Sequence, residues 1–217
     1  MQPEILITFG VMTAEKLSEV YGGVFSNLVR DAVVSFVSDE VGEDPPRVKD
    51  LQEAADYVRS RLDKYPLGHC AFWYGIGKAE SVLQGAAGPA SRLYLRDVVK
   101  RLTELDGVGG LVGKGDNTTA ALEAFKKVAT SIELLDENSY NCRGDESSSE
   151  LQIRDCPNGD GCRKLISEGI MRVGSKKPLC TISLGSAVTA EVVTNIAHDY
   201  EIIELKPPNC VAKIFRP

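Results

Sequence analysis

The fold is decided by the C-terminal stretch Tyr200-Glu-Ile-Ile-Glu-Leu-Lys-Pro-Pro-Asn-Cys-Val-Ala-Lys-Ile-Phe215, in which two apolar runs flank a turn. Both runs are rich in the β-branched and aromatic residues that are typical of strands. Between them, Lys206-Pro-Pro-Asn209 predicts a tight connection, because proline and asparagine favour turns. We therefore expect a closing hairpin made of strands over 200–205 and 210–215.

Two shorter strands and two helices are predicted upstream of this hairpin. The strands are expected at 132–135 and 150–154, one helix through Leu165–Val173 and another over 181–197. The resulting order, β-β-α-α-β-β, follows a mainly helical first part and indicates an α+β fold. We expect a helical layer packed on a small antiparallel sheet. Residues 1–130 form the helical part and 131–217 the cysteine-containing α+β part, joined in one compact domain.

The N-terminal part contains the clearest helical pattern of the chain. From Leu17 to Phe36, apolar residues recur at the i, i+3, i+4 spacing that places them on one helix face. Thr13 is the expected N-cap, and Gly22-Gly23 interrupts the middle of the pattern at a cost in helix propensity. A short strand is expected before it at Ile5–Val11. Further helices are predicted over 51–62, 93–105 and 118–129.

The charge and hydropathy of the chain exclude some classes of partner. The 217 residues contain 25 Lys and Arg against 31 Asp and Glu, which gives a net charge of −6. Most proteins that bind nucleic acid without sequence preference carry a basic stripe, and this sequence has none. No stretch is long and apolar enough for a membrane span, and the first residues lack the basic start of a signal peptide. We expect a cytoplasmic protein with no nucleic acid partner and no membrane span.

Cysteines are concentrated at the C-terminal end of the sequence. Five of the six lie in the last 76 residues: Cys142, Cys156, Cys162, Cys180 and Cys210. In Cys156-Pro-Asn-Gly-Asp-Gly-Cys162, two thiols flank a glycine-containing turn between a predicted strand and a predicted helix. Such a turn lets two sulfur atoms converge on one tetrahedral ion, and zinc is the usual choice. Reduced core or redox-active thiols, and disulfides, are the alternatives that the spacing leaves open.

Two other segments invite a chemical interpretation. His69-Cys70 contains a base and a nucleophile, but adjacent helical residues point about 100° apart, which favours a buried cysteine beside a core or surface histidine. The glycine-rich segment 107–116 resembles a phosphate-binding loop. However, Val108 and Gly115 occupy the positions where that motif requires glycine and Ser or Thr. We interpret this segment as a flexible connection.

Three C-terminal motifs together resemble the 4-vinyl reductase domain family. They are Arg154-Asp-Cys156-Pro ahead of a helix, Pro178-Leu-Cys180 opening a second helix, and the closing hairpin. The resemblance covers roughly 131–217. It implies a dimeric α+β fold with a buried pocket for a hydrophobic small molecule and, in several members, a cysteine-bound zinc. The sequence has no cysteine after Cys210, so the metal ligands of the family do not map onto it one for one.

On this basis we expect a small-molecule-binding module that forms a homodimer and takes a hydrophobic ligand. The predicted zinc ligands are Cys142, Cys156, Cys162 and Cys180. Val24, Phe25, Leu28 and Trp73 are the predicted pocket or dimer surface. The Cys-Pro…Cys pattern also resembles aminothiazoline-carboxylate hydrolase-like relatives, which makes a hydrolase or thiol enzyme the first alternative. A ligand-free interaction subunit, similar to the vesicle-tethering relatives, is the second.

Overall fold

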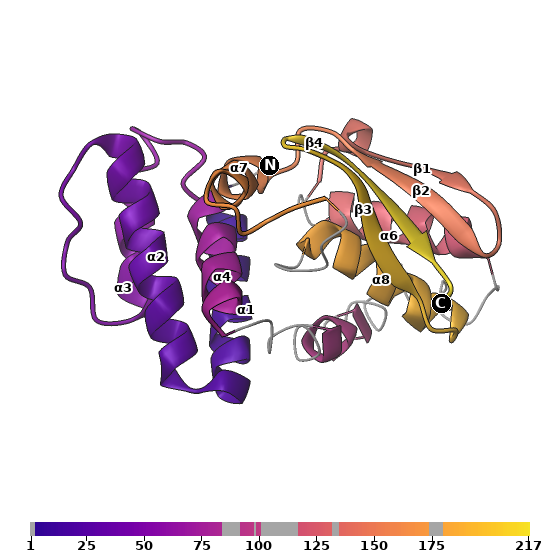
Figure 1. Cartoon of the computed structure of the whole chain (residues 1–217), viewed down its shortest axis with the longest axis horizontal. Helices are drawn as coiled ribbons and strands as arrows, with labels where there is room; N and C mark the ends of the chain where they lie inside the picture. The colour runs from indigo at the N-terminus through magenta and orange to yellow at the C-terminus, as the bar shows by residue number, and fades with distance from the viewer. Residues whose placement is uncertain (1–2, 84–91, 98, 101–116, 132–134, 174–179) are drawn as a thin grey trace. The chain divides into compact units, whose positions relative to one another are not determined.

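A computed structural model describes residues 3–83, 92–97, 99–100, 117–131, 135–173 and 180–217 of the chain (Figure 1). The chain forms two compact units, and the segments that build them alternate along the sequence. The helical unit comprises Gln2–Ala90 and Pro157–Met171, and the sheet unit comprises Ser91–Cys156 and Arg172–Pro217. This division does not fall at the predicted boundary between residues 130 and 131.

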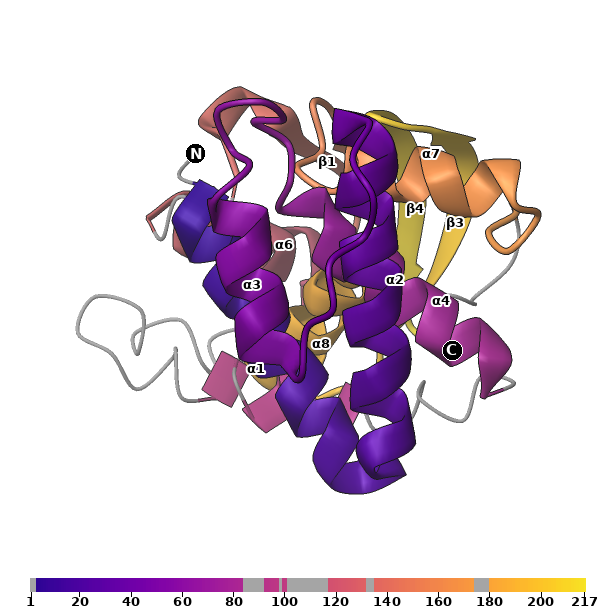
Figure 2. The same ribbon diagram turned by 90° about the vertical axis from the view of Figure 1, so that its left-hand side faces the viewer.

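The helical unit is built from helices α1 (Pro3–Tyr21), α2 (Gly23–Val41), α3 (Leu51–Arg59), α4 (Cys70–Val82) and α7 (Gly159–Ser167). Figure 2 shows α3 beside α1 and α2, with α4 behind α2. The later segment α7 packs on α4. The core between these helices consists of fully buried side chains, among them Leu6, Ile7, Leu17, Phe25, Phe36 and Phe72.

The first helix differs from the sequence prediction. The strand expected at Ile5–Val11 is wrong, because this segment is the first half of α1. Thr13 is not an N-cap either. It lies within α1, where its hydroxyl donates to the Phe9 carbonyl oxygen at 2.8 Å. The short apolar run fits both periodicities, and packing against the other helices selects the helical one. The buried positions are Leu6, Ile7, Gly10, Val11, Thr13, Ala14 and Leu17.

The expected interruption at Gly22-Gly23 is the junction between α1 and α2. Gly22 has φ of 77°, a backbone conformation that residues with a Cβ rarely adopt. The loop after α2 leads to Asp50, whose side chain accepts a hydrogen bond from the Glu53 amide and caps the predicted helix α3.

The sheet unit holds the β1 (Tyr140–Gly144), β2 (Ser148–Ile153), β3 (Asp199–Lys206) and β4 (Asn209–Phe215) strands. All neighbours are antiparallel, and the spatial order is β1-β2-β4-β3. The closing hairpin is therefore confirmed, with its turn at Pro207 and Pro208. Helical segments packed with a small antiparallel sheet also confirm the α+β class.

Helices α6 (Thr118–Ser131) and α8 (Thr181–Thr194) lie side by side against this sheet (Figure 1). The side chains on the inner strand positions are buried: Tyr140, Leu151, Ile153, Tyr200, Ile202, Ala212 and Ile214. The Tyr140 hydroxyl lies 2.8 Å from the Ser186 hydroxyl of α8, which satisfies both polar groups inside the core.

Some sequence predictions fall on residues outside the described ones. They are residues 132–134 of the predicted strand at 132–135, the part of the predicted helix at 93–105 that follows residue 100, and the glycine-rich segment 107–116. Residues 92–97 and 99–100 are helical, as predicted. A 3-10 turn at Glu137–Ser139 precedes β1. None of the described helices combines the length and the apolar character that crossing a membrane requires.

Candidate functional site

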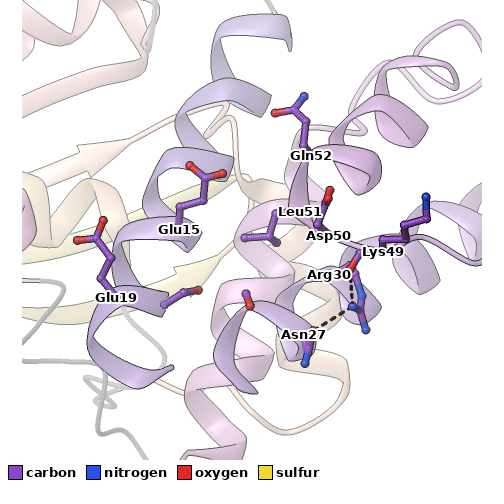
Figure 3. Close-up of a pocket in the computed structure, with 10 residues that line it drawn as sticks. Glu15, Glu19, Asn27, Arg30, Lys49, Asp50, Leu51 and Gln52 are labelled. Carbon is purple, nitrogen blue, oxygen red and sulfur yellow. Dashed lines mark hydrogen bonds between the residues drawn. The ribbon is translucent and has the colours of Figure 1, made fainter. Parts of the chain in front are cut away.

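The helical unit carries an open groove of about 660 Å³. Its walls come from the second half of α1, the first half of α2 and the start of α3. Figure 3 shows Glu15 and Glu19 projecting from α1 on one side, with Arg30 and Lys49 on the other. Leu51 points between them and is the only apolar side chain among the lining residues, which are Glu15, Ser18, Glu19, Ser26, Asn27, Arg30, Lys49, Asp50, Leu51 and Gln52.

Local geometry explains why these residues line the groove. Glu15 and Glu19 are four residues apart on α1, so both lie on the same face of the helix. Leu51 is 5% exposed and anchors the first turn of α3 in the core. Arg30 donates through Nη1 to the Lys49 carbonyl oxygen at 2.8 Å and thereby fixes the segment before α3 against α2.

Most charges in the groove already have a partner. Arg30 pairs with Asp31 at 2.7 Å, Lys49 with Glu53 at 3.3 Å, and Glu19 with Lys16 at 2.6 Å. Glu15 is the exception, because its exposed carboxylate makes no hydrogen bond or ion pair with the described part of the chain. A second lining carboxylate, Asp50, accepts a hydrogen bond from the Glu53 amide, so Glu15 is the one lining carboxylate without a partner in the described part of the chain.

A second concavity of about 590 Å³ adjoins the groove. The two share Arg30 and Lys49, which form the ridge between them. The second concavity is the more apolar of the two, and it is lined by Arg30, Asp31, Val34, Ser35, Pro45, Pro46, Arg47, Val48 and Lys49.

The residues predicted to form a hydrophobic pocket lie apart from both concavities. Phe25 is fully buried and Trp73 is 7% exposed, so both are core residues of the helical unit. Leu28 is half-buried, and Val24 is 61% exposed. Neither concavity is lined by these four residues, and their role in ligand binding stays a prediction.

The predicted zinc ligands are distributed over both units. Cys142 on β1 and Cys180, the residue before α8, belong to the sheet unit together with Cys156, whereas Cys162 lies in α7 of the helical unit. Within the described residues, no group of three or more His, Cys, Asp or Glu side chains is placed to hold a metal ion. Zinc binding by these cysteines stays a prediction.

The described cysteines are free thiols, and the shifted ones are held protonated. Burial raises the pKa of Cys70 and of Cys210 to about 11. Burial, followed by the Glu123 carboxylate that accepts a hydrogen bond from the thiol at 3.0 Å, raises the pKa of Cys142 to about 12. Because the thiolate is the nucleophile, these three cysteines are poor candidates for covalent catalysis.

His69 and Cys70 do not form a catalytic pair. Both side chains are buried, and both point to the Pro157 carbonyl oxygen, with His69 Nε2 and Cys70 Sγ each 2.8 Å from it. A carbonyl only accepts, so the histidine Nε2 and the thiol both donate. The interpretation as a buried cysteine beside a core histidine is confirmed, and the two residues tie the segment before α7 to α4.

Comparison with known proteins gives no match to a family model, to a curated sequence or to a solved structure. The resemblance to the 4-vinyl reductase domain therefore rests on its short motifs. The sequence did not predict the groove, because its walls come from residues 15–19, 26–30 and 49–52, which are separated along the chain.

Proposed function

We propose that the chain is a small-molecule-binding module whose site is the groove between α1, α2 and α3, and that its ligand is polar and bears an amine. The observation that carries the proposal is the groove of about 660 Å³ with the unpaired Glu15 carboxylate in its wall. Binding sites for small molecules commonly have volumes of 300–1,000 Å³ with a few polar groups that fix orientation.

The lining side chains explain the preference for an amine. An ammonium group beside Glu15 forms a charge-assisted hydrogen bond, which is stronger than one between neutral groups. Ser26, Asn27 and Gln52 supply uncharged donors and acceptors for the rest of the ligand. An anion gains less, because Arg30 and Lys49 are already paired with carboxylates.

The proposal keeps the binding-module class predicted from sequence and changes the character of the ligand from hydrophobic to polar. It favours binding over thiol catalysis, since Cys70, Cys142 and Cys210 are held as neutral thiols. The homodimer and the cytoplasmic location stay predictions.

The test is a thermal-shift screen at low ionic strength with 1,4-diaminobutane and L-lysine, and with butane-1,4-diol as the uncharged match. We expect the two amines to raise the melting temperature in a saturable manner and the diol to leave it unchanged. Glu15→Gln should weaken amine binding roughly tenfold, the effect of losing one charge-assisted hydrogen bond. Equal responses to the amines and to the diol would contradict the proposal.

A matched control separates this effect from a general loss of negative charge. Glu201 is exposed on β3 in the sheet unit, and Glu201→Gln removes the same charge far along the sequence from the groove. This variant should bind the amines as the unchanged protein does. Alkylation by iodoacetamide at pH 7.5 tests the alternative enzyme. One cysteine that reacts much faster than a free thiol would favour a thiol enzyme instead.

A further inference from the structure

The end of β4 places a charged side chain on the buried face of the sheet. The Arg216 amide donates to the Ser147 carbonyl oxygen at 3.1 Å and so extends the β2–β4 pairing by one step. Strand side chains alternate between faces, so Arg216 shares its face with Ile214, which is fully buried. Ile214 is paired with Ser149 on β2, and Ser149 is 1% exposed. Arg216 and Ser149 are therefore diagonal neighbours on the inner face.

Both side chains contain buried polar atoms that lack a partner. Arg216 Nε and Nη2, together with Ser149 Oγ, are inaccessible to solvent and form no hydrogen bond. Among the described residues, no carboxylate lies within ion-pair distance of Arg216. Buried polar groups are almost always satisfied, and a guanidinium without a counter-charge is costly to bury. These atoms are therefore free to bind a group from outside the chain.

The two unpartnered nitrogens of Arg216, Nε and Nη2, indicate which kind of ligand could bind there. The N–H bonds of Nε and Nη2 run parallel along one edge of the guanidinium. This edge can donate two parallel hydrogen bonds to two oxygens of one carboxylate, phosphate or sulfate. Such charge-assisted hydrogen bonds are short and strong. The remaining nitrogen, Nη1, is not among the buried atoms without a partner, and the side chain is half-buried, which leaves a route of access.

The surrounding groups leave this positive charge uncompensated. His198 is 1% exposed, and its Nδ1 lies 2.7 Å from the Ile196 carbonyl oxygen and therefore donates to it. Its Nε2 lies 2.9 Å from the Thr118 hydroxyl, whose own proton is donated to the Glu146 carbonyl oxygen at 2.7 Å. Burial lowers the pKa of His198, the charges of Arg216 and Arg92 lower it further, and Glu191 opposes them. Arg92 itself is paired with Glu191 and Asp199.

We propose that Arg216 and Ser149 form a buried site for a small oxyanion in the sheet unit. The Nε and Nη2 edge of Arg216 holds two oxygens of the anion, and the Ser149 hydroxyl donates to it. The site is independent of the groove in the helical unit and uses none of its residues. Inorganic phosphate, sulfate and acetate share the required oxygen geometry and are the probes that separate tetrahedral from planar anions.

The experiment measures thermal stability with sodium phosphate, sodium sulfate and sodium acetate, each against sodium chloride at matched ionic strength. The proposal predicts a saturable rise of roughly 3 °C with at least one oxyanion over chloride. Arg216→Gln should abolish this rise. Ser149→Ala keeps the guanidinium edge and should raise the half-saturating concentration about fivefold, as expected for the loss of one hydrogen bond.

Lys213→Gln is the matched control, because Lys213 carries the same charge on the same strand but is exposed. It should respond to oxyanions like the unchanged protein. If Arg216→Gln fails to fold, the Ser149→Ala shift and the anion series decide the question. The proposal is overturned if no oxyanion exceeds chloride, or if Lys213→Gln loses the response as well. It is also overturned if a crystal grown with the oxyanion that gives the largest rise shows only water beside Arg216.

Discussion

The groove of the helical unit and the inner face of the sheet unit hold their polar side chains in opposite ways. In the helical unit the groove places Glu15, Arg30 and Lys49 where water reaches them, and its two cations are paired with neighbouring carboxylates. In the sheet unit, Ser149 and the guanidinium edge of Arg216 lie on the covered face of the sheet, without partners. The difference shows that polarity has different consequences at the two sites. An open groove can favour a ligand of one charge over another. Buried donors without a partner are stabilised when a ligand supplies the missing acceptor.

The tightness of helix packing gives the largest expected contrast between the units. A Cβ on Gly161 of α7 would lie 2.6 Å from the Cys70 carbonyl oxygen of α4, where backbone has to move. A Cβ on Gly185 of α8 would meet only the Phe125 ring, at 3.3 Å. We expect Gly161→Ala to lower the free energy of unfolding by about 3 kcal/mol through overpacking. Gly185→Ala should change it by less than about 1 kcal/mol, because alanine favours the helix.

Urea unfolding measures this contrast. Trp73 is the only tryptophan of the chain and lies in the helical unit, so its fluorescence follows that unit. Far-UV circular dichroism follows both. If the two glycine variants had equal free energies of unfolding, α7 would not pack against α4 as closely as described above.

A matched pair of tyrosine–serine hydrogen bonds gives a smaller contrast. The Tyr140–Ser186 bond of the sheet unit is fully buried, whereas Tyr57, bonded to Ser38 at 2.9 Å in the helical unit, is 9% exposed. Ser186→Ala leaves the Tyr140 hydroxyl without water or partner and should cost about 2 kcal/mol. Ser38→Ala should cost less, about 1 kcal/mol, because Tyr57 is partly exposed whereas Tyr140 is not. The urea midpoints of the two variants check this order, and a reversed order would contradict it.

The two histidines of the chain, one in each unit, give the smallest expected effect. Burial is the main cause that lowers the pKa of both His69 and His198 below the ordinary 6.5. The unfolded chain then binds more protons than the folded one below pH 6.5, so stability falls as the pH drops below that value. Nuclear magnetic resonance titration of the two imidazole rings should give midpoints below 6.5. A midpoint above 6.5 for either ring would contradict its burial.

Most of helices α2, α3, α6 and α8 and the closing hairpin could be predicted from the sequence, because their apolar periodicity and turn residues are local signals. The first helix was predicted as a strand at Ile5–Val11, since a short apolar run fits both periods and tertiary packing decides between them. The groove could not be predicted. Glu15, Asn27 and Asp50 become neighbours only after three helix segments pack, and no local pattern records that arrangement.

The buried site at Arg216 was beyond sequence analysis for a similar reason. It depends on the pairing of Ser149 with Ile214 and on which face of the sheet the helices cover. A shift of one residue in that register would turn one of the two side chains to the outer face and separate the pair. The cysteine cluster, by contrast, was the strongest sequence signal. The thiols are divided between two units that each contain residues distant in the chain, which spacing along the sequence cannot reveal.

The most direct test of the central claim is amide chemical-shift mapping with 1,4-diaminobutane on the isotopically labelled full chain. We predict saturable shifts for groove residues on all three walls, such as Ser18, Asn27 and Gln52, and the loss of these shifts in Glu15→Gln. Unchanged groove signals at millimolar amine, or shifts confined to residues of the sheet unit, would contradict the assignment of the groove as the binding site.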